Sequence, residues 1–233
     1  MVIKIQKLTK VYNGERVLEG LSAEFKTGGR YLVKGASGAG KTTLLRLIMG
    51  LEEPDEGMIM ICPDGDGKTA GHGNAGQKDG TTEGRSCEKN YKDYKKTIRN
   101  IKISAVFQED RLCEEESAVT NIRITNPEVS TEMIRSELKK LLDAEDIDKP
   151  AAELSGGMKR RVSIVRACMV DRGIYLLDEP FTGLDAGNAK KCAEYITEKT
   201  KDGILLITSH QEEYLEYIPD LNIIDFGYER KQK

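Results

Sequence analysis

The sequence predicts an α/β fold: a core with a mainly parallel sheet, an N-terminal antiparallel β subdomain and an inserted α-helical subdomain. Three observations support it. Short apolar strands alternate with amphipathic helical segments, as in sheets whose strands are joined by helices. Residues 35–42 fit the phosphate-loop pattern G-x-x-x-x-G-K-[ST] between a strand and a helix. Residues 2–8 and 17–25 alternate apolar and polar side chains on either side of a turn.

The N-terminal alternation predicts an antiparallel hairpin with its turn at residues 12–15. Tyr12 lies at the end of this hairpin, where its ring can stack on a purine base. Packing of the same ring against the hairpin is the alternative.

The phosphate-loop pattern lies between a strand at residues 31–33 and a helix at residues 42–50. Its glycines let backbone N–H groups surround phosphate oxygens at a helix N-terminus, which favours an anion. Lys41 is expected to neutralise the β- and γ-phosphates, and Thr42 to offer a hydroxyl to Mg²⁺. A glycine-rich turn without a ligand is the alternative; the agreement of strand, loop and helix favours a P-loop NTPase core. The predicted phosphate-binding residues are Gly35, Ala36, Ser37, Gly38, Ala39, Gly40, Lys41, Thr42 and Thr43.

Composition limits the class of protein. The 233 residues are 38% hydrophobic, which is enough for a core, and the formal net charge of −3 gives no basic footprint for nucleic acid. The five cysteines are odd in number and form no C-x-x-C, so we expect neither a disulfide framework nor a zinc site. No apolar run reaches the roughly 18 to 20 residues that cross a bilayer.

The expected organisation is one domain over residues 1–233. Residues 1–112 and 171–233 would form the core, and residues 113–170 a helical subdomain. A flexible glycine-rich insertion is expected at about residues 62–88, and no metal role is expected there for His72 or Cys87. The basic stretch at 89–102 predicts a solvated helical face, with contact to anionic lipid headgroups as the alternative.

A strand precedes the expected helical subdomain, and a helical pattern opens the subdomain itself. The strand at 103–107 ends on Gln108, whose amide could reach Mg²⁺ or an attacking water. Residues 114–148 have a helical pattern, clearest at Ile134, Leu138, Leu141 and Leu142.

Ser155, Gly156 and Gly157 open another helix, with Ser155 as its N-cap. Its exposed N–H groups could bind an anion. Because Lys41 already marks one phosphate site, this second helix end suggests that each chain completes the site of another copy.

Acidic residues follow the apolar strand at 174–177. Asp178 is expected to hold Mg²⁺ through its water shell and Glu179 to polarise the hydrolytic water; an ordinary Asp-Glu turn is the alternative. The turn at 182–185 caps a helix over 186–201. His210 follows the strand at 205–208 and is placed to contact a γ-phosphate, although a lone histidine is more often structural.

Together these motifs resemble the ATP-binding-cassette (ABC) ATPase family over essentially the whole chain. The matching motifs are Gly35–Thr42 as Walker A, Gln108 as the Q-loop, Leu154–Gly157 as the LSGG signature, Asp178-Glu179 as Walker B with its catalytic glutamate, Leu184-Asp185 as the D-loop and His210 as the switch histidine.

The resemblance implies an ATPase whose cofactors are ATP and Mg²⁺. It works as a head-to-tail dimer at the cytoplasmic face of the membrane, with permease subunits, an extracytoplasmic solute-binding protein and no nucleic acid as partners. The implied catalytic residues are Glu179, His210 and Gln108, the metal contacts are Thr42, Gln108 and Asp178, and the ATP contacts are Tyr12, Gly35–Thr43, Ser155–Gly157 and Asp185.

Residues 107–112, 117–122 and 154–162 look like the importers for nitrate, sulfonates and taurine. The expected role is therefore to drive transport of a small solute by ATP-dependent dimer closure. The alternatives are an ABC ATPase of an exporter or a lipid- or lipoprotein-processing complex, and a soluble ABC ATPase that acts on nucleic acid or ribosomes. A kinase would share the phosphate loop but would have no use for Ser155–Gly157.

Overall fold

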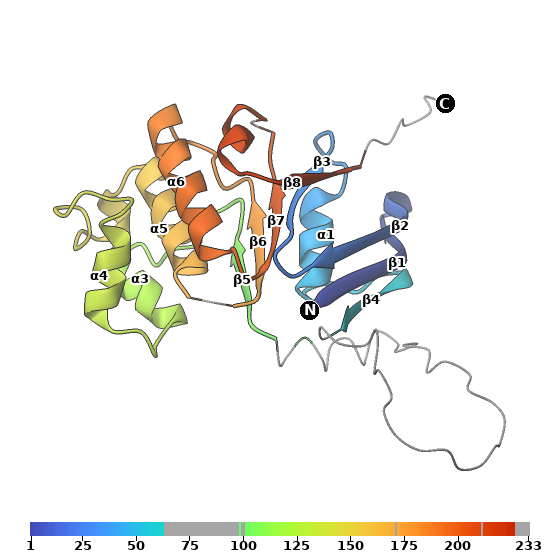
Figure 1. The fold of residues 1–233 in the computed structure, drawn as a ribbon, viewed down its shortest axis with the longest axis horizontal. Coiled ribbons are helices and arrows are strands. Elements are labelled where there is room, and N and C mark those ends of the chain that lie inside the picture. The colour runs from blue at the N-terminus through green and yellow to red at the C-terminus, as the bar shows by residue number, and fades with distance from the viewer. Residues whose placement is uncertain (63–97, 99–100, 171, 211, 227–233) are drawn as a thin grey trace, which may run out of the picture.

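A computed structural model describes residues 1–62, 98, 101–170, 172–210 and 212–226 (Figure 1). The predicted glycine-rich insertion, apart from Cys62, lies outside the described residues, as do His72 and Cys87. Most of the basic stretch at 89–102 also lies outside them.

Two sheets form the framework. The antiparallel sheet has the strand order β2-β1-β4, and the parallel sheet has the order β5-β6-β7-β3-β8. This arrangement confirms the predicted antiparallel β subdomain beside a parallel core. The antiparallel strands are β1 (Val2–Tyr12), β2 (Glu15–Lys26) and β4 (Glu56–Cys62), and the parallel strands are β3 (Arg30–Lys34), β5 (Ile103–Val106), β6 (Ile174–Asp178), β7 (Ile204–Thr208) and β8 (Leu221–Asp225).

Helix α1 (Lys41–Ile48) lies between the two sheets (Figure 1). Its apolar residues at 44, 45, 47 and 48 are buried. They share one apolar cluster with Ile3 and Phe25 of the antiparallel sheet and with Val33 of the parallel sheet. The phosphate loop is therefore attached to a helix that both sheets hold in place.

The central parallel strands β6 and β7 are buried along their whole length, and their successive side chains point to opposite faces of the sheet. In β6, Ile174 and Leu176 join the cluster around α1, whereas Tyr175 and Leu177 join the cluster of the helical side. Because these strands are buried, their carboxyl ends, which carry the candidate functional side chains, are held in place.

The helical side carries α3 (Ala118–Thr125), α4 (Thr131–Leu138), α5 (Gly156–Cys168) and α6 (Ala186–Lys199). Helices α3, α4 and α5 follow β5 and precede β6, which confirms an inserted helical subdomain (Figure 1). Each of the four helices begins after a residue whose side chain accepts a bond from a first-turn N–H. These N-caps are Ser117, Ser130, Ser155 and Asp185.

Two details differ from the expected helices. The apolar pattern at 134, 138, 141 and 142 is buried throughout, but α4 ends at Leu138 and the last two residues lie in a turn. Helix α6 ends at Lys199 rather than at 201: the backbone of Thr200 leaves the helical conformation, while its hydroxyl donates to the carbonyl of Ile196.

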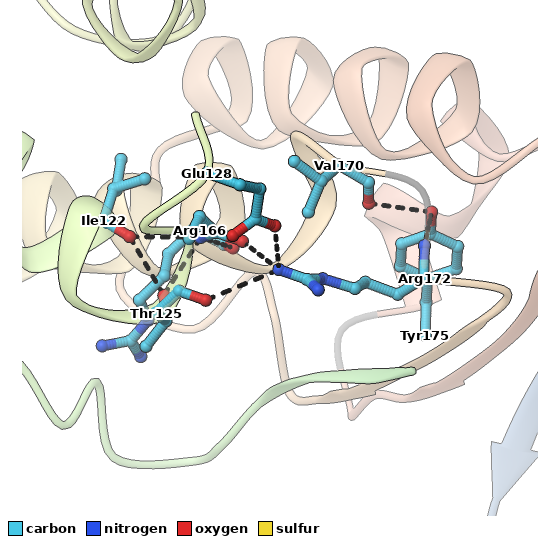
Figure 2. A network of polar contacts seen from close by, with 8 residues as sticks. Ile122, Thr125, Glu128, Arg166, Val170, Arg172 and Tyr175 are labelled. Carbon is cyan, nitrogen blue, oxygen red and sulfur yellow. Dashed lines mark hydrogen bonds and ion pairs between the residues drawn. The ribbon is translucent and has the colours of Figure 1, made fainter. Parts of the chain in front are cut away.

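Arg172 ties the helical subdomain to the segment before β6 (Figure 2). Its Nη2 donates to the side-chain oxygen of Asn126 and lies 3.3 Å from a carboxylate oxygen of Glu128. Next to it the Tyr175 hydroxyl donates to the carbonyl of Val170 at 3.2 Å. Because Asn126 is almost fully buried, its side chain needs such partners, and the contact fixes the end of α3.

None of the described helices is both long enough and apolar enough to cross a membrane.

Candidate functional site

One cavity of about 360 Å³ lies at the start of α1. It collects predicted residues from five separate stretches of the chain, four of which lie at the carboxyl ends of β3, β5, β6 and β7, at one edge of the sheet. The lining residues are Tyr12, Val17, Ser37, Gly38, Ala39, Gly40, Lys41, Thr42, Thr43, Gln108, Asp178, Glu179 and His210.

The phosphate loop has the geometry of an anion site. Gly40 is the N-cap of α1 with φ = 90°, and as a glycine it has no side chain to cap the first N–H groups of this helix. A Cβ on Gly40 would lie 2.9 Å from the carbonyl oxygen of Val17, so only glycine fits there. Free N–H groups at a helix start favour an anionic ligand.

Lys41 is buried within this loop, with 7% of its surface exposed. Its Nζ donates to the carbonyl oxygens of Gly35 at 2.8 Å and Ala36 at 3.1 Å. The same atom lies 3.2 Å from Nε2 of His210. The ammonium group thus sits at the centre of the loop, where a phosphate would enter.

Asp178 closes the opposite side of the cavity at the end of β6. The hydroxyl of Thr42 donates to its Oδ2 at 2.7 Å. No group of three or more His, Cys, Asp or Glu residues in the described chain could hold a metal by itself. Mg²⁺, however, uses one or two protein oxygens together with phosphate and water, so this hydroxyl and carboxylate fit that ion.

Glu179 occupies a turn directly after the strand, with φ = 51°. The backbone N–H of His210 donates to its Oε2 at 3.0 Å. Its Oε1 lies 3.4 Å from the His210 ring and is buried without a hydrogen-bond partner among the described residues. A buried oxygen of this kind requires a partner, and a water or ligand in the cavity can supply one.

Gln108 is exposed at the cavity edge, and its loop is held from below by Arg160 of α5. Arg160 is 4% exposed and donates to the carbonyls of Phe107, at 2.6 Å, and Gln108. Its Nε lies 3.2 Å from Oδ1 of Asp110. Burial raises the pKa of Asp110, and the charge of Arg160 opposes that rise.

The signature residues do not line this cavity. Ser155 accepts from the N–H of Met158 at 3.3 Å and caps α5, as predicted. Gly157 faces a turn, since a Cβ there would lie 3.0 Å from the Gly183 carbonyl oxygen. Asp185 accepts from the N–H of Asn188 at 2.9 Å. Within one chain, Ser155–Gly157 and Asp185 therefore form a surface apart from Lys41.

Tyr12 lies at the cavity with 38% of its surface exposed. Its hydroxyl donates to Glu52, and the ammonium of Lys10 lies 5.3 Å from the ring centre. The ring is thus both accessible to a base and packed near the hairpin, so stacking remains a prediction.

Sequence reasoning missed two residues that contact the site, Arg160 and Thr208, whose hydroxyl donates to Oδ1 of Asp178 at 2.6 Å. Ser163 and Arg166, three and six residues after Arg160, donate to the carbonyl of Asp110 in the same loop. The polar residues at this helical spacing were the available signal. For Thr208 the signal was a polar residue ending an otherwise apolar buried strand.

The chain is similar in sequence to one known protein family and to individual proteins of known role. The family described as ABC transporter matches residues 18–182. A sulfate/thiosulfate import ATP-binding protein of Rhizobium meliloti is 31% identical over 97% of this chain and 58% of its own length. One from Acinetobacter baylyi is 29% identical over 97% of this chain and 60% of its own. The chain thus spans about three fifths of these relatives.

Solved structures share the fold. An ABC transporter ATP-binding protein of Pyrococcus furiosus has a TM-score of 0.72 at 24% identity. The match covers 97% of this chain and 98% of the Pyrococcus chain. The dimeric structure of a bacterial ABC transporter cassette has a TM-score of 0.72 at 23% identity. That match covers 98% of this chain and 97% of the cassette.

Proposed function

Because this chain belongs to the ABC transporter family, we propose that it is an ATP-binding and ATP-hydrolysing subunit of an ABC transporter. The observation that carries the proposal is the cavity that gathers Lys41, Asp178, Glu179 and His210 around the phosphate loop. Residues 1–112 and 171–233 would be its ATP-binding core, and residues 113–170 its helical subdomain.

The phosphate loop would hold the β- and γ-phosphates. Backbone N–H groups at the start of α1 line the cavity, and the N-cap Gly40 has no side chain to cap them. Lys41 Nζ would exchange its bonds to the loop carbonyls for bonds to phosphate oxygens. Tyr12 would stack on the base.

Thr42, Gln108 and Asp178 would hold Mg²⁺, directly or through water. The ion would neutralise charge that develops on the β- and γ-phosphate oxygens. The pairing of the Thr42 hydroxyl with the Asp178 carboxylate supports this role, since it brings two hard oxygens to one point.

Glu179 would orient and deprotonate the attacking water. The support is its Oε1, which is buried without a hydrogen-bond partner among the described residues. His210 holds the other oxygen through its N–H, and its ring, which is half exposed, would contact the γ-phosphate.

The active form would be a head-to-tail dimer. Ser155 and Gly156 are exposed and lie outside the cavity of Lys41, so a second copy is needed to bring them to the γ-phosphate. Asp185 would lie at the same interface. Closure on two ATP molecules, and release after hydrolysis, would supply the motion that drives transport.

The proposed system is an importer of a small oxyanion at the cytoplasmic face of the membrane. The sulfate/thiosulfate import proteins support this, and they are close to the nitrate, sulfonate and taurine importers that the sequence resembles. Permease subunits and an extracytoplasmic binding protein would be partners. Co-purification with the permease, followed by ATPase stimulation by sulfate with its binding protein, tests the substrate class.

Replacing Lys41 tests ATP binding at the cavity. We expect Lys41→Ala to lose nucleotide affinity about 100-fold or more, because the buried ammonium neutralises the phosphates. Titration with a fluorescent ATP analogue measures the effect. Lys190→Ala, on the exposed face of α6, is the matched control and should bind as the wild type does. Unchanged affinity in Lys41→Ala would refute the assigned site.

A further inference from the structure

We propose that Thr208 is a positioning residue that orients both carboxylates of the site, Asp178 and Glu179. This inference rests on the proposed ATPase function. The buried hydroxyl of Thr208 would have a role of its own, separate from the roles of the phosphate loop and the acidic residues.

The position of Thr208 follows from strand register. Strands β6 and β7 are parallel neighbours, and Asp178 pairs with Thr208 at their carboxyl ends. Thr208 is fully buried, at 0% exposure. The four residues before it in β7 are apolar and equally buried. A hydroxyl in that place needs partners, whereas valine would have filled the same volume without them.

The hydroxyl has a partner on each side. Thr208 Oγ1 donates to Oδ1 of Asp178 at 2.6 Å and accepts from the N–H of Glu179 at 3.0 Å. An amide N–H can only donate, so the hydroxyl proton must point to the carboxylate. This direction is therefore fixed by the chain, and Thr208 links two consecutive residues of the neighbouring strand end.

For Asp178, the bond sets the rotation of the carboxylate. Oδ1 is held by Thr208 inside the sheet, and Oδ2 faces the Thr42 hydroxyl at 2.7 Å on the cavity side. Without Thr208 the buried Oδ1 would lose this partner, and the carboxylate would turn toward other donors. The oxygen offered to Mg²⁺ would then be displaced.

For Glu179, the bond holds an unfavourable backbone conformation. Its φ of 51° is uncommon for a residue with a side chain. Its N–H is shared between the hydroxyl and the carbonyl oxygen of Thr208, at 3.0 and 3.2 Å. This conformation brings the glutamate side chain to the N–H of His210. Thr208 thereby fixes the direction from which Glu179 faces the attacking water.

The test compares Thr208→Val, which replaces the hydroxyl with a methyl group, with Thr208→Ser, which keeps the hydroxyl and loses the methyl group. In Thr208→Val we expect kcat to fall about 10- to 100-fold and the Mg²⁺ concentration for half-maximal turnover to rise by a similar factor. ATP affinity measured in EDTA should stay unchanged, because the phosphate loop is intact. Thr208→Ser should restore kcat and Mg²⁺ dependence to within about threefold of the wild type.

Thr200→Val is the matched control. Thr200 is also buried, at 1% exposure, but its hydroxyl donates to the carbonyl of Ile196 at the end of α6. Its loss should lower the melting temperature without changing Mg²⁺ dependence. Hydrogen exchange of the Glu179 amide gives a readout independent of turnover, and it should accelerate in Thr208→Val alone.

Two results would overturn the inference while the wild type hydrolyses ATP. One is a folded Thr208→Val variant with wild-type kcat and Mg²⁺ dependence. The other is an equal loss in Thr208→Ser, which would indicate packing rather than the hydroxyl. A wild-type chain without Mg²⁺-dependent hydrolysis would instead contradict the proposed function, and the inference would fall with it.

Discussion

Two glycines of the phosphate loop share a left-handed backbone but have different surroundings. Gly38 has φ = 77° and nothing within 4 Å of the position of a Cβ. Gly40 has φ = 90°, and a Cβ there would lie 2.7 Å from Leu18 Cδ2 and 2.9 Å from the Val17 carbonyl oxygen. Gly40 is therefore required for two reasons: its left-handed backbone conformation and its close approach to β2.

This difference predicts unequal losses of stability. Gly40→Ala should lower the free energy of unfolding by about 2 to 5 kcal/mol, because strain at positive φ adds to overlap with β2. Gly38→Ala should cost only the strain, about 1 to 2 kcal/mol. Urea unfolding without nucleotide measures both. Equal losses would show that β2 does not press on the loop.

At this scale the sequence was informative about the residues that meet a ligand. The phosphate loop and the acidic strand end could be located because each is a short pattern next to an apolar strand. Their gathering in one cavity follows from parallel strands that end at the same edge. Thr208 and Arg160 could not be assigned, because their roles depend on contacts with residues about 30 and 50 positions away.

Among the helices, Glu137 joins α4 to the end of α6. Lys199 donates to its Oε1 at 2.9 Å, and Lys140 lies 3.1 Å from the same oxygen. Burial raises the pKa of Glu137, but the ammonium groups of Lys199 and Lys140 outweigh burial, so the net pKa is lowered. The carboxylate therefore stabilises the contact between α4 and the end of α6.

The lowered pKa fixes the sign of a pH dependence. Glu137 contributes stability above its unfolded pKa of about 4.3, and this contribution is lost as pH falls through the lower folded pKa. Glu137→Gln should therefore destabilise the protein at pH 7 by about 1 to 3 kcal/mol. The difference from the wild type should shrink below about pH 4.

Glu198→Gln is the control for this prediction. Glu198 lies 3.7 Å from Lys140 and 3.8 Å from Lys199, but its side chain is 63% exposed. Such a pair contributes little, so the change should stay within about 0.5 kcal/mol at every pH. A pH-independent loss in Glu137→Gln would show that packing, not charge, is what Glu137 provides.

Strands and helices were predictable where the spacing of apolar residues followed a single pattern. Strands β6 and β7 are buried on both faces and read as continuous apolar runs, which located them in the sequence. The end of α4 was not predictable, because Leu141 and Leu142 continue the helical spacing while the chain already turns. The buried apolar spacing therefore continues about one turn beyond the end of the observed helix.

In the whole molecule, α1 and the phosphate loop are held between two sheets, and Ser155–Gly157 lie on the helical side (Figure 1). The two-sheet architecture followed from the hairpin and the apolar runs. How two copies would contact each other could not be predicted from one sequence. The sequence supported only the inference that a second helix end suited to phosphate needs a second copy. Separation of Ser155 from the Lys41 cavity supports that inference.

The dimer is the central claim, and the mass of Glu179→Gln with ATP and Mg²⁺ tests it most directly. This variant should bind ATP but not hydrolyse it, because the water loses its base, so the closed dimer should accumulate. Light scattering after size exclusion should then give twice the monomer mass, and adding Ser155→Arg should return the monomer. A Glu179→Gln chain that binds ATP yet remains monomeric at high concentration would contradict the account.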